Sequence, residues 1–307
     1  MNLREWALPV YTTMMQMAGG AMLALWLIRS YAAKHYGRDH VDRVMDNPIL
    51  IIFLTVSVAI LGSHFHLSKP YQSFLAVLNF RNSWLSREIV FTLVVFVFLF
   101  WLLYLQLTTI GKWRLKTAIG WLAILFFAAN TYAMSHIYLL PTQATWDTPV
   151  TIVSFLGTAL LLGGIALVSI LIMDLKYSEL RASYKVEVQE HILQNALPGL
   201  GVSALIIAMI VLLENLLQLQ TLNNTDIQTA HVSIHLLLQL YPALFGMRLT
   251  VMGLGVLLMI GTIYWFKHHQ KPVSELFAPT YVSCLLVMIG EFLGRFLFYA
   301  THIRLGL

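Results

Sequence analysis

Residues 87–108, REIVFTLVVFVFLFWLLYLQLT, decide the fold class of this chain. After Glu88 the stretch contains no charged side chain, and most of its residues are aliphatic or aromatic. An α-helix needs about 20 apolar residues to cross the hydrocarbon core of a bilayer. Because lipid offers the backbone no hydrogen bonds, one apolar run of this length predicts a transmembrane α-helix.

Comparable runs recur from one end of the sequence to the other. Hydrophobic residues make up 59% of the 307 residues and charged residues only 11%, whereas a soluble domain has about 25% charged residues. The chain is therefore predicted to be an all-α integral membrane protein with a single polytopic domain over residues 1–307. Eight transmembrane helices in two four-helix bundles are expected, over residues 10–30, 48–67, 87–108, 116–138, 150–174, 197–219, 246–266 and 278–300.

Prolines mark several of the predicted helix starts. The first helical turn does not need the backbone N–H that proline lacks, so proline is tolerated there. Pro48 opens the second predicted helix, and Pro149, Pro198 and Pro242 mark three later starts.

Lysine and arginine are concentrated in the loops after the first, third, fifth and seventh predicted helices. Cytoplasmic loops carry the excess of these residues, so both termini are predicted to lie on the outer, periplasmic side. The cations that support this orientation are Arg29, Lys34, Arg38, Arg43, Lys112, Arg114, Lys116, Lys176, Arg181, Lys185, Lys267 and Lys271. The net charge of +5 is then a topology signal, and no nucleic-acid partner is expected. The single cysteine, Cys284, excludes an internal disulfide and a cysteine-ligated metal site.

The predicted outer loop between the second and third helices departs from this charge rule. It carries Lys69, Arg81 and Arg87 on the side where topology requires no cations. Such residues are candidates for binding a ligand or a partner protein. The alternatives are contact with lipid headgroups or an ion pair at a helix end.

Ionisable residues within the predicted helices gather in the outer half of the bundle, and such residues are functional candidates by default. They are His64, His66, Glu88, His136, Glu214, Arg248, Glu291 and Arg295. Structural roles are open for several of them. Glu291 and Arg295 are four residues apart and are expected to neutralise each other along one helix face. His136 is expected to cap a helix end or to be a hydrogen-bonded core residue, and Glu214 can meet interfacial water.

His66 and Glu88 belong to helices joined by one short outer loop, so they are expected to lie near each other. An imidazole and a carboxyl group at the mouth of an apolar cavity can exchange protons with a ligand. A lipophilic carrier of two electrons and two protons, such as a quinol, fits this chemistry. Two alternatives stay open: a b-type cytochrome with haem between His66 and His136, and a proton-coupled small-molecule transporter.

Two segments resemble the membrane anchor subunit family of dimethyl sulfoxide reductase. Residues 66–89, HLSKPYQSFLAVLNFRNSWLSREI, are similar to its signature of HLG-x-P, a Leu-rich turn and a serine-rich stretch that ends in glutamate. Residues 290–306, GEFLGRFLFYATHIRLG, resemble its final helix, and MRLTV at 247–251 looks like its seventh-helix arginine. The sequence departs from the family in having Lys69 before the proline and in a longer outer loop over 220–247.

The resemblance implies a haem-free anchor subunit, without a metal of its own, in the bacterial inner membrane. Such a subunit oxidises menaquinol and passes the electrons to an iron–sulfur subunit with four clusters. A molybdopterin subunit then reduces dimethyl sulfoxide or a related oxidised substrate. The quinol-site histidine and glutamate of the family correspond to His66 and Glu88, and we expect Arg81 and Arg87 to assist them. Lys69 and Arg81 are expected to contact the iron–sulfur partner.

Overall fold

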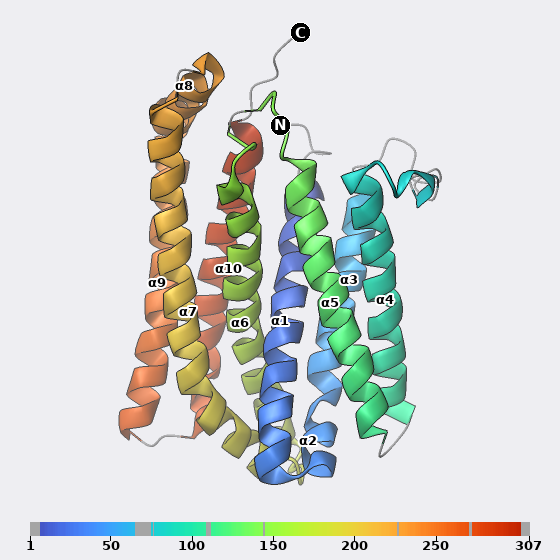
Figure 1. The fold of residues 1–307 in the computed structure, drawn as a ribbon. Helices are drawn as coiled ribbons and strands as arrows, with labels where there is room; N and C mark the ends of the chain where they lie inside the picture. The colour runs from blue at the N-terminus through green and yellow to red at the C-terminus, as the bar shows by residue number, and fades with distance from the viewer. Residues whose placement is uncertain are drawn as a thin grey trace.

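The computed structural model is built of helices connected by short segments (Figure 1). It describes residues 7–64, 75, 77–108, 112–143, 145–225, 227–269 and 272–301. The long helices are α1 (Ala7–Tyr36), α3 (Asp46–His64), α4 (Trp84–Thr108), α5 (Trp113–Ile137), α6 (Pro149–Leu180), α7 (Val186–Asn223), α9 (Pro242–His269) and α10 (Phe277–Ala300). The shorter elements are α2 (Arg38–Val44), α8 (Gln228–His235), the π-helix η3 (Leu236–Leu240) and the 3-10 turn η4 (Val273–Leu276).

Within the described residues, seven helices are long and apolar enough to cross a membrane: α3, α4, α5, α6, α7, α9 and α10 together with η4. The remaining predicted span, residues 10–30, lies in α1. This helix has 30 residues but is less apolar than the other seven. Helix α1 contacts α3, α5, α6 and α10. Because protein surrounds much of α1, this helix can carry buried polar residues that a lipid-facing helix would not tolerate.

Helices α3, α4 and α5 group with α1, helices α7, α9 and α10 group with α6, and α1 and α6 also pack extensively against each other. We call α1, α3, α4 and α5 the first bundle and α6, α7, α9 and α10 the second bundle. Figure 1 shows the two bundles side by side, with α1 and α6 at their junction. The short helix α8 lies at one end of the molecule and α2 at the opposite end. We call these the α8 end and the α2 end. The start of α1, the start of α4 and the end of α10 lie at the α8 end.

Two glycines allow the bundles to touch through their backbones. A Cβ atom on Gly163 of α6 would lie 2.5 Å from the Ala21 nitrogen and the Gly20 Cα of α1. A Cβ atom on Gly20 would collide with the carbonyl oxygen of Ala159. Glycine is therefore required on both helices for this close approach.

A buried ionic cluster closes the α2 end of the first bundle. Asp42 of α2 pairs with Arg29 of α1 at 3.2 Å and with Lys116 of α5 at 2.5 Å. The side chains of Arg29 and Lys116 are 0% and 1% exposed, and the Arg29 guanidinium also lies 3.4 Å from the ring centre of Trp113. The expectation that this half of the protein holds almost no buried charge is therefore wrong.

A second polar group extends this cluster towards the second bundle. Lys185 pairs with Asp46 at 3.0 Å, and Gln106 donates to the same carboxylate at 2.9 Å. Asn47 and Gln189 both bond to Asp174. Several cations that were expected only to set topology thus also connect helices.

Two expectations about helix ends need correction. Pro149 and Pro242 begin α6 and α9 as predicted, but Pro198 lies inside α7, twelve residues after the helix starts at Val186. The expected outer loop over 220–247 is mostly helical, because it contains the end of α7, then α8, η3 and the start of α9. Part of this segment covers a cavity in the second bundle.

Candidate functional site

The start of α4 is fixed by its own sequence. Ser83 accepts a hydrogen bond from the backbone N–H of Ser86 at 3.3 Å, as a serine before the first helical turn commonly does. Arg87 donates to the carbonyl oxygens of Phe80 and Arg81 at 3.1 and 2.7 Å, and its guanidinium lies 4.1 Å from the ring centre of Trp84. Arg87 therefore holds the preceding turn against α4.

Glu88 lies one position further along α4 and is buried, with 6% of its surface exposed. The Tyr11 hydroxyl of α1 lies beside its carboxyl group. Tyr11 and Thr92 form a hydrogen bond of 2.8 Å. Asn130 of α5 donates to Thr92 at 2.8 Å and to the backbone oxygen of Glu88 at 3.1 Å. We call Tyr11, Glu88, Thr92 and Asn130 the Glu88 network.

The predicted histidines lie near helix ends or outside the described residues. His64 is exposed at the end of α3, where its Nδ1 lies 2.8 Å from the Ile60 carbonyl oxygen. His136 ends α5 in a similar bond to Tyr132 and lies against the Trp84 ring, with the ring centres 4.5 Å apart. His136 thus bonds within its own helix, which agrees with a hydrogen-bonded structural role and is not a helix cap. His66 and Lys69 fall outside the part of the sequence that the structure describes.

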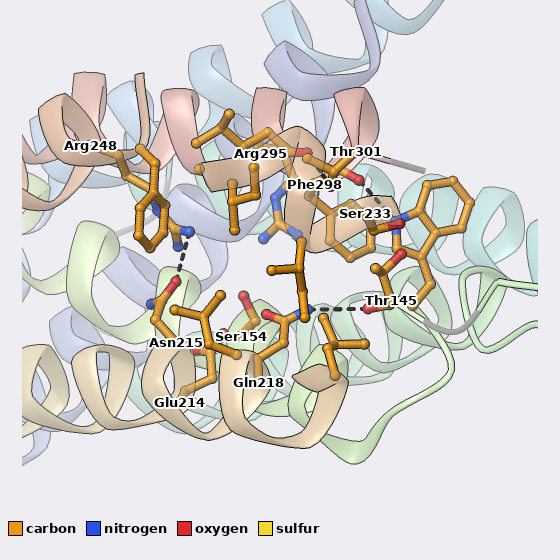
Figure 2. Close-up of a pocket in the computed structure, with 18 of the residues that line it drawn as sticks. Thr145, Ser154, Glu214, Asn215, Gln218, Ser233, Arg248, Arg295, Phe298 and Thr301 are labelled. Atoms are coloured by element: carbon orange, nitrogen blue, oxygen red, sulfur yellow. Dashed lines mark hydrogen bonds between the residues drawn. The ribbon is translucent and has the colours of Figure 1, made fainter. Parts of the chain in front are cut away.

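The other four predicted polar residues meet in one cavity of the second bundle (Figure 2). Glu214 comes from α7, Arg248 from α9, and Glu291 and Arg295 from α10. The cavity has a volume of about 60 Å³, and Thr145, Gln218, Ser233 and Thr301 line it nearest the α8 end.

The charged groups in this cavity bond mainly to neutral side chains. Arg248 donates to Asn215 at 2.8 Å. Thr158 donates to Glu291 at 2.7 Å, while Arg295 donates to Gln16 of α1 at 3.0 Å and lies 3.4 Å from the Thr158 hydroxyl. The expected ion pair between Glu291 and Arg295 is therefore wrong, because Thr158 lies between the two charges and no direct bridge is found among the described residues.

A model of the DMSO reductase anchor subunit (DmsC) family matches residues 1–301. The protein belongs to this family. It is similar to the C subunit of anaerobic dimethyl sulfoxide reductase from Haemophilus influenzae, with 25% identity over 100% of this protein and 98% of the relative. The anaerobic dimethyl sulfoxide reductase subunit YnfH of Escherichia coli K12 is 26% identical, over 99% of this protein and 96% of the relative. The C subunit of the reductase from the same organism is 24% identical, again over 99% and 96%.

Family membership and the apolar helices identify a multi-pass membrane anchor subunit of a DMSO reductase complex. Its partners are the other subunits of that complex. In the part of this anchor subunit that the structure describes, no three His, Cys, Asp or Glu side chains lie close enough together to hold a metal ion.

Sequence analysis missed the neutral partners of the charged residues. In the anchor subunit these are Tyr11, Thr92 and Asn130 around Glu88, and Thr158 and Asn215 in the cavity. A search for uncharged polar residues within the predicted spans would have found several of them. Asn130, for example, stands between two pairs of apolar or small residues, in FAANTYA at 127–133.

Proposed function

We propose that this anchor subunit oxidises menaquinol at the α8 end of the first bundle and passes the electrons to the iron–sulfur subunit of its complex. The observation that carries the proposal is Glu88, a buried carboxyl group with hydroxyl and amide neighbours near the end of a transmembrane helix. The proposal places all eight helices across the bacterial inner membrane, with both termini and the α8 end in the periplasm. The crowding of lysine and arginine at the α2 end supports this orientation.

The chemistry requires groups that accept protons next to an apolar site. Oxidation of a quinol breaks two O–H bonds and yields a quinone, two electrons and two protons. In this proposal the Glu88 carboxylate accepts one proton and His66 the other. Tyr11 and Asn130 hold the Glu88 segment in place through Thr92 and the backbone. The tail of the quinol lies among the apolar side chains that α3 and α4 expose to lipid, such as Leu61 and Leu93.

The electrons leave through the partner subunit. We place its docking surface on the turn before α4, where Leu78, Phe80 and Arg81 are exposed. An iron–sulfur cluster above this turn would lie close to the Glu88 network. From there the electrons reach the molybdopterin subunit, which reduces dimethyl sulfoxide or a related oxidised substrate. Lys69 is assigned to the same docking surface from its position in the sequence.

Replacing Glu88 with glutamine tests the proton-accepting role. Quinol-dependent reduction by membranes that contain the whole complex is expected to fall about 100-fold, because glutamine keeps the shape but cannot accept a proton. A dye that reduces the partner subunits directly should support normal turnover. Glu187→Gln is a matched control, since this exposed glutamate lies in the first turn of α7, far along the chain from Glu88. Normal quinol activity in both Glu88→Gln and His66→Ala would refute the proposed site.

Reversing the charge of Arg81 tests the docking surface. Arg81→Glu is expected to reduce the partner subunits recovered with the membrane about tenfold, because a repulsive charge at an interface weakens association. Arg38→Glu makes the same change on an exposed residue of α2, at the other end of the molecule, and should assemble normally. Equal recovery of the partners with both variants would exclude Arg81 from the interface.

A visible absorption spectrum of the purified complex separates the proposal from the b-type cytochrome alternative. Bound haem gives a strong absorption band, whereas direct transfer of electrons from quinol to the iron–sulfur subunit does not require haem. A haem band that disappears in His136→Ala would replace the proposed mechanism with the cytochrome one.

A further inference from the structure

The second-bundle cavity contains buried polar atoms that have no hydrogen-bond partner among the described residues. They are Oε2 of Glu214, Oε1 of Glu291 and Nε of Arg248. Glu214 and Glu291 are 4% and 3% exposed. Buried polar atoms without a protein partner are expected to bind ordered water, because leaving them unpaired costs free energy.

The size of the cavity agrees with bound water. A buried water needs about 10–15 Å³ of accessible space and two to four polar partners. A cavity of about 60 Å³ therefore has room for about four water molecules. The polar side chains and unpartnered oxygens that line this space suit water.

A strip of polar residues connects this cavity with the Glu88 network across the bundle junction. Tyr138 and Tyr299 form a hydrogen bond of 2.8 Å, and both lie near the carboxyl group of Glu88 and the guanidinium of Arg295. Tyr299 lies beside Thr12 of α1, the residue that follows Tyr11. In the same segment of α1, Thr13 Oγ1 and Gln16 Nε2 are also buried without a partner among the described residues.

In the assembled complex, the cavity can offer a route to the periplasm where the surface above Glu88 cannot. If the partner docks on the turn before α4, it covers the direct route from Glu88 to the periplasm. The side chains of the cavity near the α8 end, Thr145, Gln218, Ser233 and Thr301, belong to the second bundle and its connections. They lie away from the proposed docking surface.

We propose that the second-bundle cavity is a water-filled proton exit. Protons from quinol oxidation pass from Glu88 along the polar strip to water in the cavity, where Glu291 and Glu214 bind them in turn, and leave at the α8 end. The two electrons leave separately, to the oxidised iron–sulfur cluster of the partner, so charge and atoms balance. This inference rests on the proposed function, and it assigns Glu214 and Glu291 to proton transfer and not to quinol binding.

The cavity is faced by α6, α7, α9 and α10, and its charged groups come from the last three of these helices. Helix α6 contributes the neutral Ser154 and Thr158, and α7 contributes Glu214. Helix α9 contributes Arg248, and α10 contributes Glu291 and Arg295. Two carboxyl groups and two guanidinium groups thus face the same cavity. Because the charges bond mainly to hydroxyl and amide groups, each carboxylate keeps an oxygen that can accept a proton from water.

The test compares Glu291→Gln with Glu88→Gln in membranes that contain the whole complex. For Glu291→Gln, quinol-dependent kcat is expected to fall about tenfold, since a relay group can be bypassed in part by water. The KM for quinol and the dye-dependent activity should stay unchanged, and the solvent deuterium isotope effect on kcat should increase. Glu214→Gln, on a different helix, should show the same pattern, and Glu187→Gln should show none of it.

Each other outcome leads to a definite conclusion. If Glu88→Gln is inactive with quinol while Glu291→Gln and Glu214→Gln behave as wild type, the proton exit lies elsewhere and the proposed function stands. If Glu291→Gln raises the KM for quinol strongly, the cavity belongs to the quinol site and the exit proposal is overturned. Normal activity in all three variants would reject the proposed function together with the exit.

Discussion

Asp42→Asn is expected to lower the free energy of unfolding by about 3–5 kcal/mol, the cost of breaking a buried ion pair by removing one partner. Asp42 is the shared counterion of Arg29 and Lys116, which are 0% and 1% exposed. Asparagine has the same size but no charge, so the two buried cations would lose their shared counterion. The change is predicted to loosen α2 from α1 and α5.

Unfolding of the purified protein by titration of a denaturing detergent measures this effect. Asp39→Asn is the matched control, because Asp39 is an exposed residue of the same short helix. Lys116→Met combined with Asp42→Asn should be more stable than Asp42→Asn alone, since it removes one of the two unpaired charges. Equal stability of the Asp42 and Asp39 variants would show that the ionic cluster does not stabilise the fold.

The ionic cluster of Asp42, Arg29 and Lys116 also shows which features could not be predicted from the sequence. The loop counts of lysine and arginine, which predict the orientation in the membrane, depend only on sequence position. The burial of Arg29 and Lys116 depends on α2, a seven-residue helix without an apolar run that would reveal it. Residues 29 and 116 share one carboxylate only after the protein has folded.

The charged residues of the candidate site could be predicted from the sequence, but their hydrogen-bond partners could not. Buried ionisable residues are rare in apolar helices, so Glu214, Arg248, Glu291 and Arg295 could be recognised individually, and the structure brings all four into one cavity. The spacing of Glu291 and Arg295 predicted a pair along one helix. Tertiary contacts with Thr158 and Gln16 replaced that local pair, and such contacts between distant helices have no signature in sequence spacing.

The second large expected effect is a loss of stability when Gly163, at the junction of the two bundles, is replaced. Gly163→Leu is expected to destabilise the protein by more than about 3 kcal/mol, because overpacking a close contact forces backbones apart. Even the Cβ atom of an alanine would lie 2.5 Å from backbone atoms of Ala21 and Gly20 in α1. Backbone atoms within a packed helix cannot move aside as a flexible side chain can, so Gly163→Ala should already cost about 2 kcal/mol.

The neighbouring glycine provides the control. A Cβ atom on Gly164 meets no atom within 4 Å, and replacing a glycine within a helix by alanine contributes up to about 1 kcal/mol of stability. Gly164→Ala and Gly163→Ala thus share the same gain in helix propensity, and their difference in detergent unfolding isolates the steric term. Similar stabilities for the two alanine variants would mean that α1 and α6 do not touch at Gly20 and Gly163. A large difference, with loss of quinol-dependent but not dye-dependent turnover in Gly163→Ala, would show that α1 and α6 must pack tightly for the Glu88 network to function.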